Sequence, residues 1–341
     1  MSATTIVEKP DAGATGEPPE QRSATRQLLP SVFERYSGIV VWAGIIVLFG
    51  IIEPSTFLTS TTLRSLLSQQ AITAIMALAL LLPLAAGVYD LSVAGMMGLA
   101  IMLVAWFQAT AHTGFALAIV LTLLAGVMVG CFNAFVVVGL GVDSFIATLG
   151  MSSILLGLVE WISKGNQIVE GISPSFLNVA DKQIFSIQLP FFYMLILAAV
   201  LWYVLEYRQV GRYMFATGSN PEAARLAGVR TDRLRALSLV VSAVVASIAG
   251  IIFVAQIGSA SPDSSTSYLL PAFAGALLGA TQIRPGRVNV PGTLLAVYLL
   301  ATGIQGLELA GAQLWVQDVF NGAALVIAVA FAVRAARRRR N

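Results

Sequence analysis

Residues 65–112 have the sequence SLLSQQAITAIMALALLLPLAAGVYDLSVAGMMGLAIMLVAWFQATAH, and Asp90 is the single formal charge in this stretch. A helix needs about 20 predominantly apolar residues to cross the ~30 Å hydrocarbon core of a bilayer. The stretch is therefore long enough for two crossings, and Asp90 lies between them. We predict two membrane-spanning helices, at residues 67–87 and 91–110, joined by a very tight turn.

The composition of the whole chain supports a membrane protein. Of its 341 residues, 57% are hydrophobic and 11% are charged, whereas a soluble domain is about one quarter charged. The chain has too few charges to cover a water-soluble fold of this length. With one His and one Cys, a single chain can form neither a His/Cys metal cluster nor a disulfide. We expect no metal site, no cofactor and no nucleic-acid partner.

Further apolar runs of near-span length follow one another along the chain. The fifth and eighth, 144–162 and 267–281, are short and rich in glycine, so each is either a full span or a broken or re-entrant helix, and the second run is also a candidate for a break. The chain is predicted to be an all-α, polytopic membrane bundle with about ten transmembrane helices, at residues 37–54, 67–87, 91–110, 115–139, 144–162, 189–206, 236–257, 267–281, 290–307 and 318–334.

The charges predict the domain organisation and the orientation. Residues 1–35, rich in proline and poor in apolar runs, are expected to be a disordered cytoplasmic tail. Residues 36–334 would form the membrane domain, and residues 335–341 a basic cytoplasmic tail. Ten spans place 17 of the 20 Lys and Arg residues on the side of both termini. Because basic residues concentrate on the cytoplasmic side, both termini are predicted to be cytoplasmic.

Two GxxxG patterns, Gly126/Gly130 and Gly275/Gly279, lie within predicted spans. Small residues four positions apart let two helices approach closely in a bilayer, where packing drives association. Because the chain contains 30 glycines, chance pairs are equally plausible. The sequence leaves both interpretations open.

The longest polar segment inside the membrane domain is residues 207–235. Its second half predicts a short helix over 221–228, since Asn220 is a favourable N-cap, Pro221 suits the first helical position, and Gly228 suits the position after the helix. Glu222 would lie in the first turn, where a negative charge is favourable. About two turns of helix are not stable alone in water. The segment is predicted to dock onto another surface, or to lie flat on the membrane.

Glu222-Ala223-Ala224, followed by three residues and Gly228, is similar to the coupling loop in permease subunits of bacterial ABC importers. The longer pattern resembles the ribose/xylose/galactoside-type sugar permease family, and three further segments, 90–93, 144–150 and 306–311, match that family in the same order. The resemblance covers about residues 37–334. It implies that the residues that couple to the ATPase are Gly211, Arg212, Asn220, Pro221, Glu222, Ala223, Ala224 and Gly228.

The resemblance also implies a function and partners. The chain would form the pathway of an importer for a monosaccharide or related small polar solute, in a bacterial cytoplasmic (inner) membrane. Its partners would be a cytoplasmic ABC ATPase, an extracytoplasmic substrate-binding protein and a second permease chain, as a homodimer. Independently, the sequence contains no GxxxxGK[ST] phosphate-binding loop. The chain is therefore not expected to be an enzyme, and ATP would be bound by a partner chain.

Polar residues within the predicted spans are candidates for the pathway, because sugars are recognised by hydroxyls and amides. Each is also a candidate for an interhelical hydrogen bond, which is the commoner role. Asp90 has two possible roles: an N-cap of the third span, which would contribute about 1 kcal/mol, or a solute contact. The candidates are Gln69, Gln70, Asp90, Ser92, Asn133, Thr148, Ser152, Ser153, Gln256, Gln305 and Asn321.

The sequence leaves three alternatives to this function. An ion-coupled secondary transporter normally needs ionisable residues at mid-membrane, and the candidates are Asp90 and Glu160. A permease of the same type could carry an amino acid, a nucleoside or a small signal molecule. An intramembrane enzyme is disfavoured, because one His and two carboxylates offer little acid–base chemistry.

Overall fold

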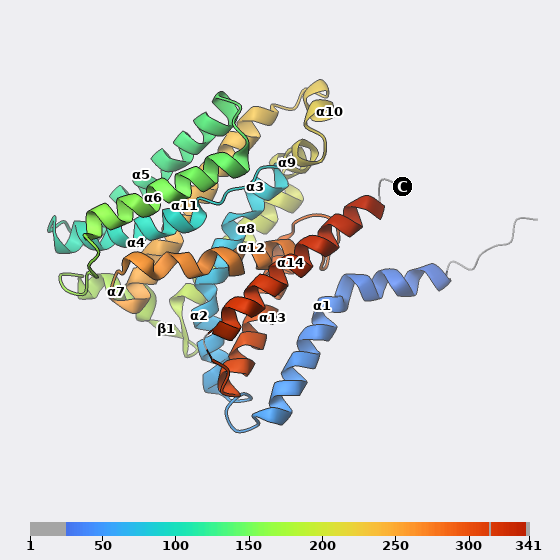
Figure 1. The fold of residues 1–341 in the computed structure, drawn as a ribbon, viewed down its shortest axis with the longest axis horizontal. Coiled ribbons are helices and arrows are strands. Elements are labelled where there is room, and N and C mark those ends of the chain that lie inside the picture. The colour runs from blue at the N-terminus through green and yellow to red at the C-terminus, as the bar shows by residue number, and fades with distance from the viewer. Residues whose placement is uncertain (1–24, 314, 339–341) are drawn as a thin grey trace, which may run out of the picture.

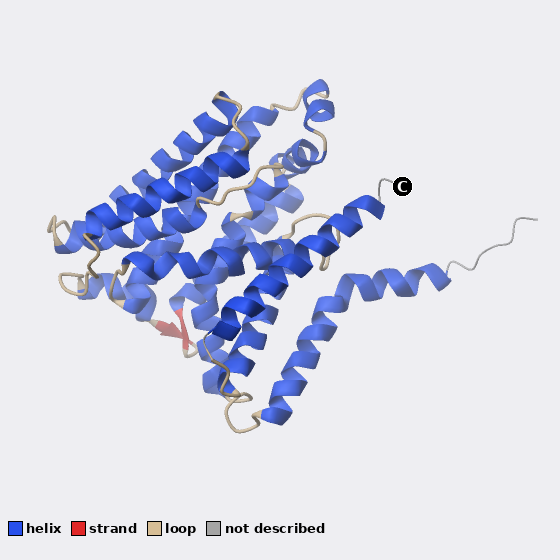
Figure 2. Ribbon diagram, in the orientation of Figure 1, coloured by secondary structure: helices blue, strands red, loops and turns tan. Residues whose placement is uncertain are grey.

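The computed structural model describes residues 25–313 and 315–338, which form a bundle of helices with one small β-hairpin (Figure 1, Figure 2). The hairpin pairs β1 (Gln183–Ile184) with β2 (Ile187–Gln188) in antiparallel orientation, so the chain is mostly helical rather than all-α. The helices are α1 (Thr25–Ile52), α2 (Ser60–Ala79), α3 (Leu81–Ala85), α4 (Val93–Ala109), α5 (Phe115–Ala134), the π-helix η1 (Phe135–Gly139), α6 (Ser144–Ser163), α7 (Pro174–Asp181), α8 (Leu189–Tyr207), α9 (Gln209–Ser219), α10 (Pro221–Leu226), α11 (Thr231–Ile257), the 3₁₀ helix η2 (Pro262–Tyr268), α12 (Leu269–Gly279), α13 (Val290–Leu309) and α14 (Trp315–Arg338).

Six helical segments among the described residues are long and apolar enough to cross a membrane, judged by length and composition. Two shorter apolar helices, Ser37–Ile52 and Val93–Ala109, add to them. Helix lengths alone therefore do not establish the predicted ten spans. The six segments are Ser60–Ala85, Phe115–Gly139, Ser144–Ser163, Leu189–Tyr207, Thr231–Ile257 and Val290–Leu309.

The structure shows whether the second, fifth and eighth predicted spans are each one continuous helix. α6 is one continuous helix of 20 residues, so the fifth span is intact. The second keeps span length as Ser60–Ala85 but is interrupted at Leu80 between α2 and α3, because Pro83 has no N–H to bond the carbonyl four residues earlier. The eighth is also broken: α12 has 11 residues and is about 16 Å long, about half of the hydrocarbon core.

The bundle has two distinct ends (Figure 1). α9 and α10 lie at one end, here the α10 end, and α7 and the hairpin lie at the other, the α7 end. At the α7 end, Ile168 pairs with Ala260 through backbone hydrogen bonds, and Gln256 Nε2 donates to Gln188 Oε1 at 2.7 Å. At the α10 end, the Gly38 N–H donates to Gln282 Oε1 at 2.7 Å. Each contact joins two segments that the ten-span prediction places on the same side of the membrane.

α4 forms the centre of the bundle, between α5, α6 and α11. It is apolar on all faces, as expected of a fully enclosed helix, and 13 of its 17 residues are buried. Glycines allow close approach here: a Cβ on Gly95 would lie 3.0 Å from the Ser152 carbonyl oxygen of α6, and one on Gly250 of α11 would lie 2.6 Å from the Met97 carbonyl oxygen.

Both GxxxG patterns lie at close helix contacts. A Cβ on Gly130 of α5 would lie 2.6 Å from Val240 Cα of α11, and Gly126 faces Ser247 of the same helix. Gly275 and Gly279 of α12 face α13, where Gly279 would meet the Thr293 backbone. The packing interpretation is therefore confirmed for both patterns.

The termini differ from the predicted tails. α1 begins at Thr25, so residues 25–35 are helical and not part of a disordered tail. α14 continues to Arg338, so the predicted basic tail is helical as far as that residue. Residues 1–24 and 339–341 lie outside the described residues.

Candidate functional site

The local prediction for α10 is confirmed in detail. Asn220 is the N-cap, and its side-chain Oδ1 accepts a hydrogen bond from the Ala223 N–H at 3.0 Å. Pro221 is the first helical residue, and Gly228 has φ +84°, a conformation that favours glycine. The helix ends at Leu226, two residues earlier than predicted.

The first half of the polar segment contains a helix that the sequence analysis missed. α9 follows α8 after a single extended residue, Arg208. Gly211 makes this sharp turn possible, because a Cβ there would collide with the Leu205 backbone. Its buried residues, Gly211, Met214 and Thr217, recur every three positions, a helical period that the local prediction did not use.

The two helices present an open surface at the α10 end. Ala224 points inward at 6% exposed, whereas the Leu226 side chain is 91% exposed. Arg212, Glu222 and other predicted coupling residues are also exposed. α10 thus carries one large apolar side chain in water, surrounded by charges.

α9 contacts the turn before α4 through two glycines. A Cβ on Gly218 would collide with the Ala85 carbonyl oxygen and lie 3.0 Å from the Gly87 backbone nitrogen. Gly87 itself has φ +75°. α9 is therefore packed directly against the turn that holds Asp90.

We expect Gly218→Ala to destabilise the protein by about 1–3 kcal/mol, the usual range for overpacking. The measurement is the thermal unfolding midpoint of the purified protein in detergent. Gly44→Ala in α1 is the matched control, because nothing lies within 4 Å of a Cβ at that position. Equal midpoints for the two variants would contradict the tight glycine contact.

Four of the predicted pathway candidates meet at one buried cluster beyond this turn. Asp90 Oδ1 accepts hydrogen bonds from the Ser92 N–H at 3.1 Å and the Ser92 hydroxyl at 2.6 Å. Asn133 Nδ2 of α5 donates to Ser92 Oγ at 2.8 Å, and Thr148 Oγ1 of α6 accepts from the Leu91 N–H at 2.9 Å. All four side chains are buried, with Asp90 at 0% exposed. The cluster ties the α3–α4 turn to α5 and α6.

The predicted N-cap role of Asp90 is wrong. Ser92 occupies the N-cap position of α4 and makes no side-chain capping bond. Asp90 instead closes a local turn onto Ser92, two residues further on. Its other oxygen, Oδ2, is buried without a hydrogen bond among the described residues. Asn133 and Thr148 thus make the interhelical hydrogen bonds that were the commoner expectation for polar residues within the spans.

We expect Asn133→Ala to lower the free energy of unfolding by about 1–2 kcal/mol, near the upper range for interhelical bonds in membranes. The KM for uptake should stay the same, because the side chain is buried at 1% exposed. Cys131→Ala, two residues away and exposed, is the control for both measurements. A raised KM at unchanged stability would instead indicate solute contact.

The remaining pathway candidates are scattered. Gln69 of α2 is exposed and bonds Ser65 of its own helix at 2.8 Å, and Gln256 bonds the hairpin. Ser152 packs against Gly95 of α4. Among the described residues, no hydrogen bond links any of these side chains to the Asp90 cluster. Of the other candidates, Gln70 lies in α2, Ser153 in α6, Gln305 in α13 and Asn321 in α14.

An ionic cluster at the α10 end, here the Glu206 latch, was not predicted. It consists of Glu206 at the end of α8, with both Arg284 and Arg287 of the α12–α13 loop bound to its Oε2. The Glu206 side chain is only 8% exposed. The Arg287 guanidinium also lies over the Phe215 ring of α9, 4.6 Å from its centroid. Thus the α12–α13 loop contacts both α8 and α9. From the sequence alone, these arginines predicted only that their loop faces the cytoplasmic side of the membrane.

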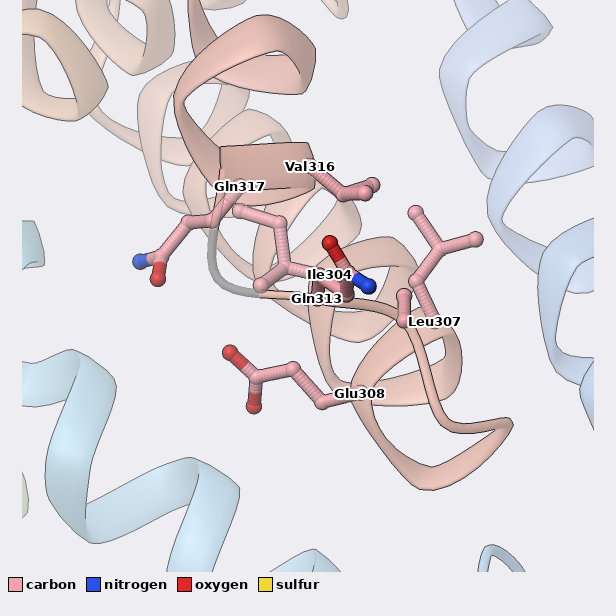
Figure 3. A pocket seen from close by; sticks show the side chains of 7 residues that line it. Ile304, Leu307, Glu308, Gln313, Val316 and Gln317 are labelled. Atoms are coloured by element: carbon pink, nitrogen blue, oxygen red, sulfur yellow. The ribbon is translucent and has the colours of Figure 1, made fainter.

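A small hollow lies between α13 and α14 (Figure 3). Glu308, Gln313 and Gln317 surround it together with Ile304, Leu307 and Val316. Its cavity volume of about 10 Å³ is barely enough for one water molecule and far below the ~300–1,000 Å³ of ordinary ligand pockets. We assign it no ligand.

Curated relatives cover most of the chain. The D-allose transport system permease protein of Escherichia coli (strain K12) is 26% identical over 87% of this chain and 91% of its own length. The ribose import permease protein of the same strain is 29% identical over 80% of this chain and 86% of its own length. An autoinducer 2 import system permease protein from Photorhabdus laumondii is 30% identical over 83% of this chain and 86% of its own length. No solved structure matches.

A family model described as "Branched-chain amino acid transport system / permease component" matches residues 62–329. The match includes α2 to α13 and most of α14, and thus the coupling segment, the Asp90 cluster and the Glu206 latch. The protein therefore belongs to the family of branched-chain amino acid transport system permease components.

Proposed function

We propose that the chain is the membrane-spanning subunit of an ATP-driven importer for a monosaccharide. The relatives named as ribose and allose permeases support a sugar as the solute. The observation that carries the coupling role is α10, a capped helix in which the Leu226 side chain is 91% exposed. An exposed leucine on so short a helix is best explained by a protein partner that covers it.

The proposed topology has ten crossings, with both termini and the α10 end in the cytoplasm. α2–α3 and η2–α12 each make one broken crossing. Support comes from the charges: segments 207–235 and 280–289 at the α10 end carry eight arginines, whereas Arg64, Lys164 and Lys182 belong to the opposite side. This is the distribution of basic residues that a cytoplasmic α10 end requires.

The proposed mechanism begins at α10, which docks on a cytoplasmic ATPase. Closure of the ATPase moves α9 and α10 as a rigid pair. The movement reaches the Asp90 turn through the Gly218–Gly87 contact and the α12–α13 loop through the Glu206 latch. Packed helices then shift between two arrangements, as in shear-type transitions. A second copy of this chain would complete the pathway, and an extracytoplasmic binding protein would deliver the solute.

The test is uptake by proteoliposomes that contain this chain, its ATPase and its binding protein. ATP-dependent accumulation of one labelled monosaccharide, absent without ATP or without the binding protein, would support the proposal. Accumulation that follows a proton or sodium gradient without ATP would support a secondary transporter instead.

The autoinducer 2 permeases among the relatives favour a second candidate, uptake of a small signal molecule. The same proteoliposomes decide between the two. A panel of pentoses, hexoses and autoinducer 2 would be tested with binding protein present. Only the true solute should stimulate ATP hydrolysis.

A further inference from the structure

The break in the eighth crossing is an unusually polar segment. Residues 261–268 have the sequence SPDSSTSY, in which six of the eight side chains carry a hydroxyl. Most of the segment forms η2, a 3₁₀ helix, and η2 runs directly into α12 at Leu269. The sequence analysis placed part of it inside an apolar span and assigned none of these residues to the pathway.

η2 lies below the α7 end of the bundle rather than on its surface. It packs against α4 and α6, and a Cβ on Gly98 of α4 would lie 2.5 Å from Ser265 Oγ. The same Cβ would be 3.7 Å from Val159 of α6. Val159 precedes the end of α6 by four residues, about 6 Å, and Gly98 precedes the end of α4 by eleven, about 16 Å. Ser265 therefore lies about 6–16 Å below these helix ends, between the outer surface and the middle of the ~30 Å core of the proposed bilayer.

One side of η2 is anchored and the other is open. Pro262 and Ser265 are buried, and the Ser265 hydroxyl has no hydrogen-bond partner among the described residues. Asp263, Thr266 and Ser267 are exposed. The Thr266 hydroxyl donates only to the Asp263 carbonyl of its own turn, at 3.0 Å.

A lipid-facing position is physically excluded for this open side. Non-helical backbone at membrane depth is tolerated only where it is enclosed in protein or lines a water-filled cavity. An exposed carboxylate and two hydroxyls in hydrocarbon would each add a desolvation cost. The open side must therefore face water or another polar surface.

We propose that the open side of η2, formed by Asp263, Thr266 and Ser267, lines the outer half of the translocation pathway and contacts a polyhydroxylated solute. The inference rests on the proposed function and specifies where the solute passes. Hydroxyls both donate and accept, and the Asp263 carboxylate accepts, which suits the alternating hydroxyls of a neutral sugar.

The experiment uses the sole cysteine of the chain, Cys131. In the Cys131→Ala background, Thr266→Cys and Ser267→Cys are made separately. The controls are Ile196→Cys on the exposed face of α8, at 63% exposed, and buried Ser265→Cys. The complete transporter in proteoliposomes is treated on both sides with a water-soluble, membrane-impermeant maleimide during ATP turnover. Thr266→Cys and Ser267→Cys should react at least about tenfold faster than either control.

The second readout is uptake after labelling. The adduct at Ser267→Cys should block ATP-driven uptake, and saturating solute with binding protein should slow the labelling. Labelling no faster than at Ile196→Cys would overturn the inference, and so would full uptake by the labelled protein. Failure of the proposed function would look different, because the unlabelled Cys131→Ala complex would then show no ATP-driven uptake at all.

Discussion

Replacing Leu226 by aspartate is expected to abolish ATP-driven uptake while the protein remains folded. The side chain is 91% exposed, so the substitution removes little packing and should change the free energy of unfolding by less than about 0.5 kcal/mol. An apolar anchor buried by a partner typically contributes at least about 2 kcal/mol. The affinity for the ATPase should fall by about 30-fold, as measured by titrating purified ATPase against the detergent-solubilised chain.

Leu140→Asp is the matched control for this prediction. Leu140 follows η1 and is also an exposed leucine, at 61%, but it does not belong to α9 or α10. Its substitution should leave the affinity for the ATPase within about twofold of wild type. If Leu226→Asp binds the ATPase and transports as wild type does, α10 is not the docking helix.

The second large effect, on both stability and coupling, is expected from Glu206→Gln. Removing one partner of a fully buried ion pair costs about 3–5 kcal/mol. The Arg284 and Arg287 side chains are 44% and 37% exposed, so water compensates in part and we expect about 1–3 kcal/mol. Because the latch joins α8 and α9 to the α12–α13 loop, uptake per ATP hydrolysed should also fall, although the ATPase still binds.

Arg208→Gln provides the control for the latch. Arg208 follows α8 closely, and its guanidinium lies 5.7 Å from the Tyr203 ring centroid on the exposed side. Its loss should alter neither the unfolding midpoint nor the coupling ratio. If Glu206→Gln lowers the midpoint but keeps the wild-type ratio of uptake to hydrolysis, the latch is only a structural contact.

Much of the fold could be predicted because membranes constrain it strongly. Apolar runs of span length predicted α2, α4, α5, α6, α8, α11 and α13, whereas α7 and α9 were not predicted. The N-cap and C-terminal glycine of α10 followed from Asn220 and Gly228. The break before α12 could only be suspected. Glycine content signals irregularity, but the depth of η2 depends on the contact of Ser265 with Gly98, between residues far apart in the sequence.

The candidate site could be predicted only in part, for a similar reason. Polarity within a span singled out Asp90, Ser92, Asn133 and Thr148, but their meeting in one cluster depends on how α4, α5 and α6 pack. The Glu206 latch was missed because its carboxylate lies at the end of a span, where charge is ordinary. Its burial depends on arginines about 80 positions away in the chain.

The most direct test of the central claim is the energy source of uptake. Proteoliposomes with this chain, its ATPase and its binding protein would be loaded with ATP, or with a non-hydrolysable analogue, in the presence of ionophores that collapse all ion gradients. The account predicts solute accumulation with ATP and none with the analogue, with accumulation abolished by Leu226→Asp. Accumulation that needs an intact ion gradient and proceeds without the ATPase would contradict it.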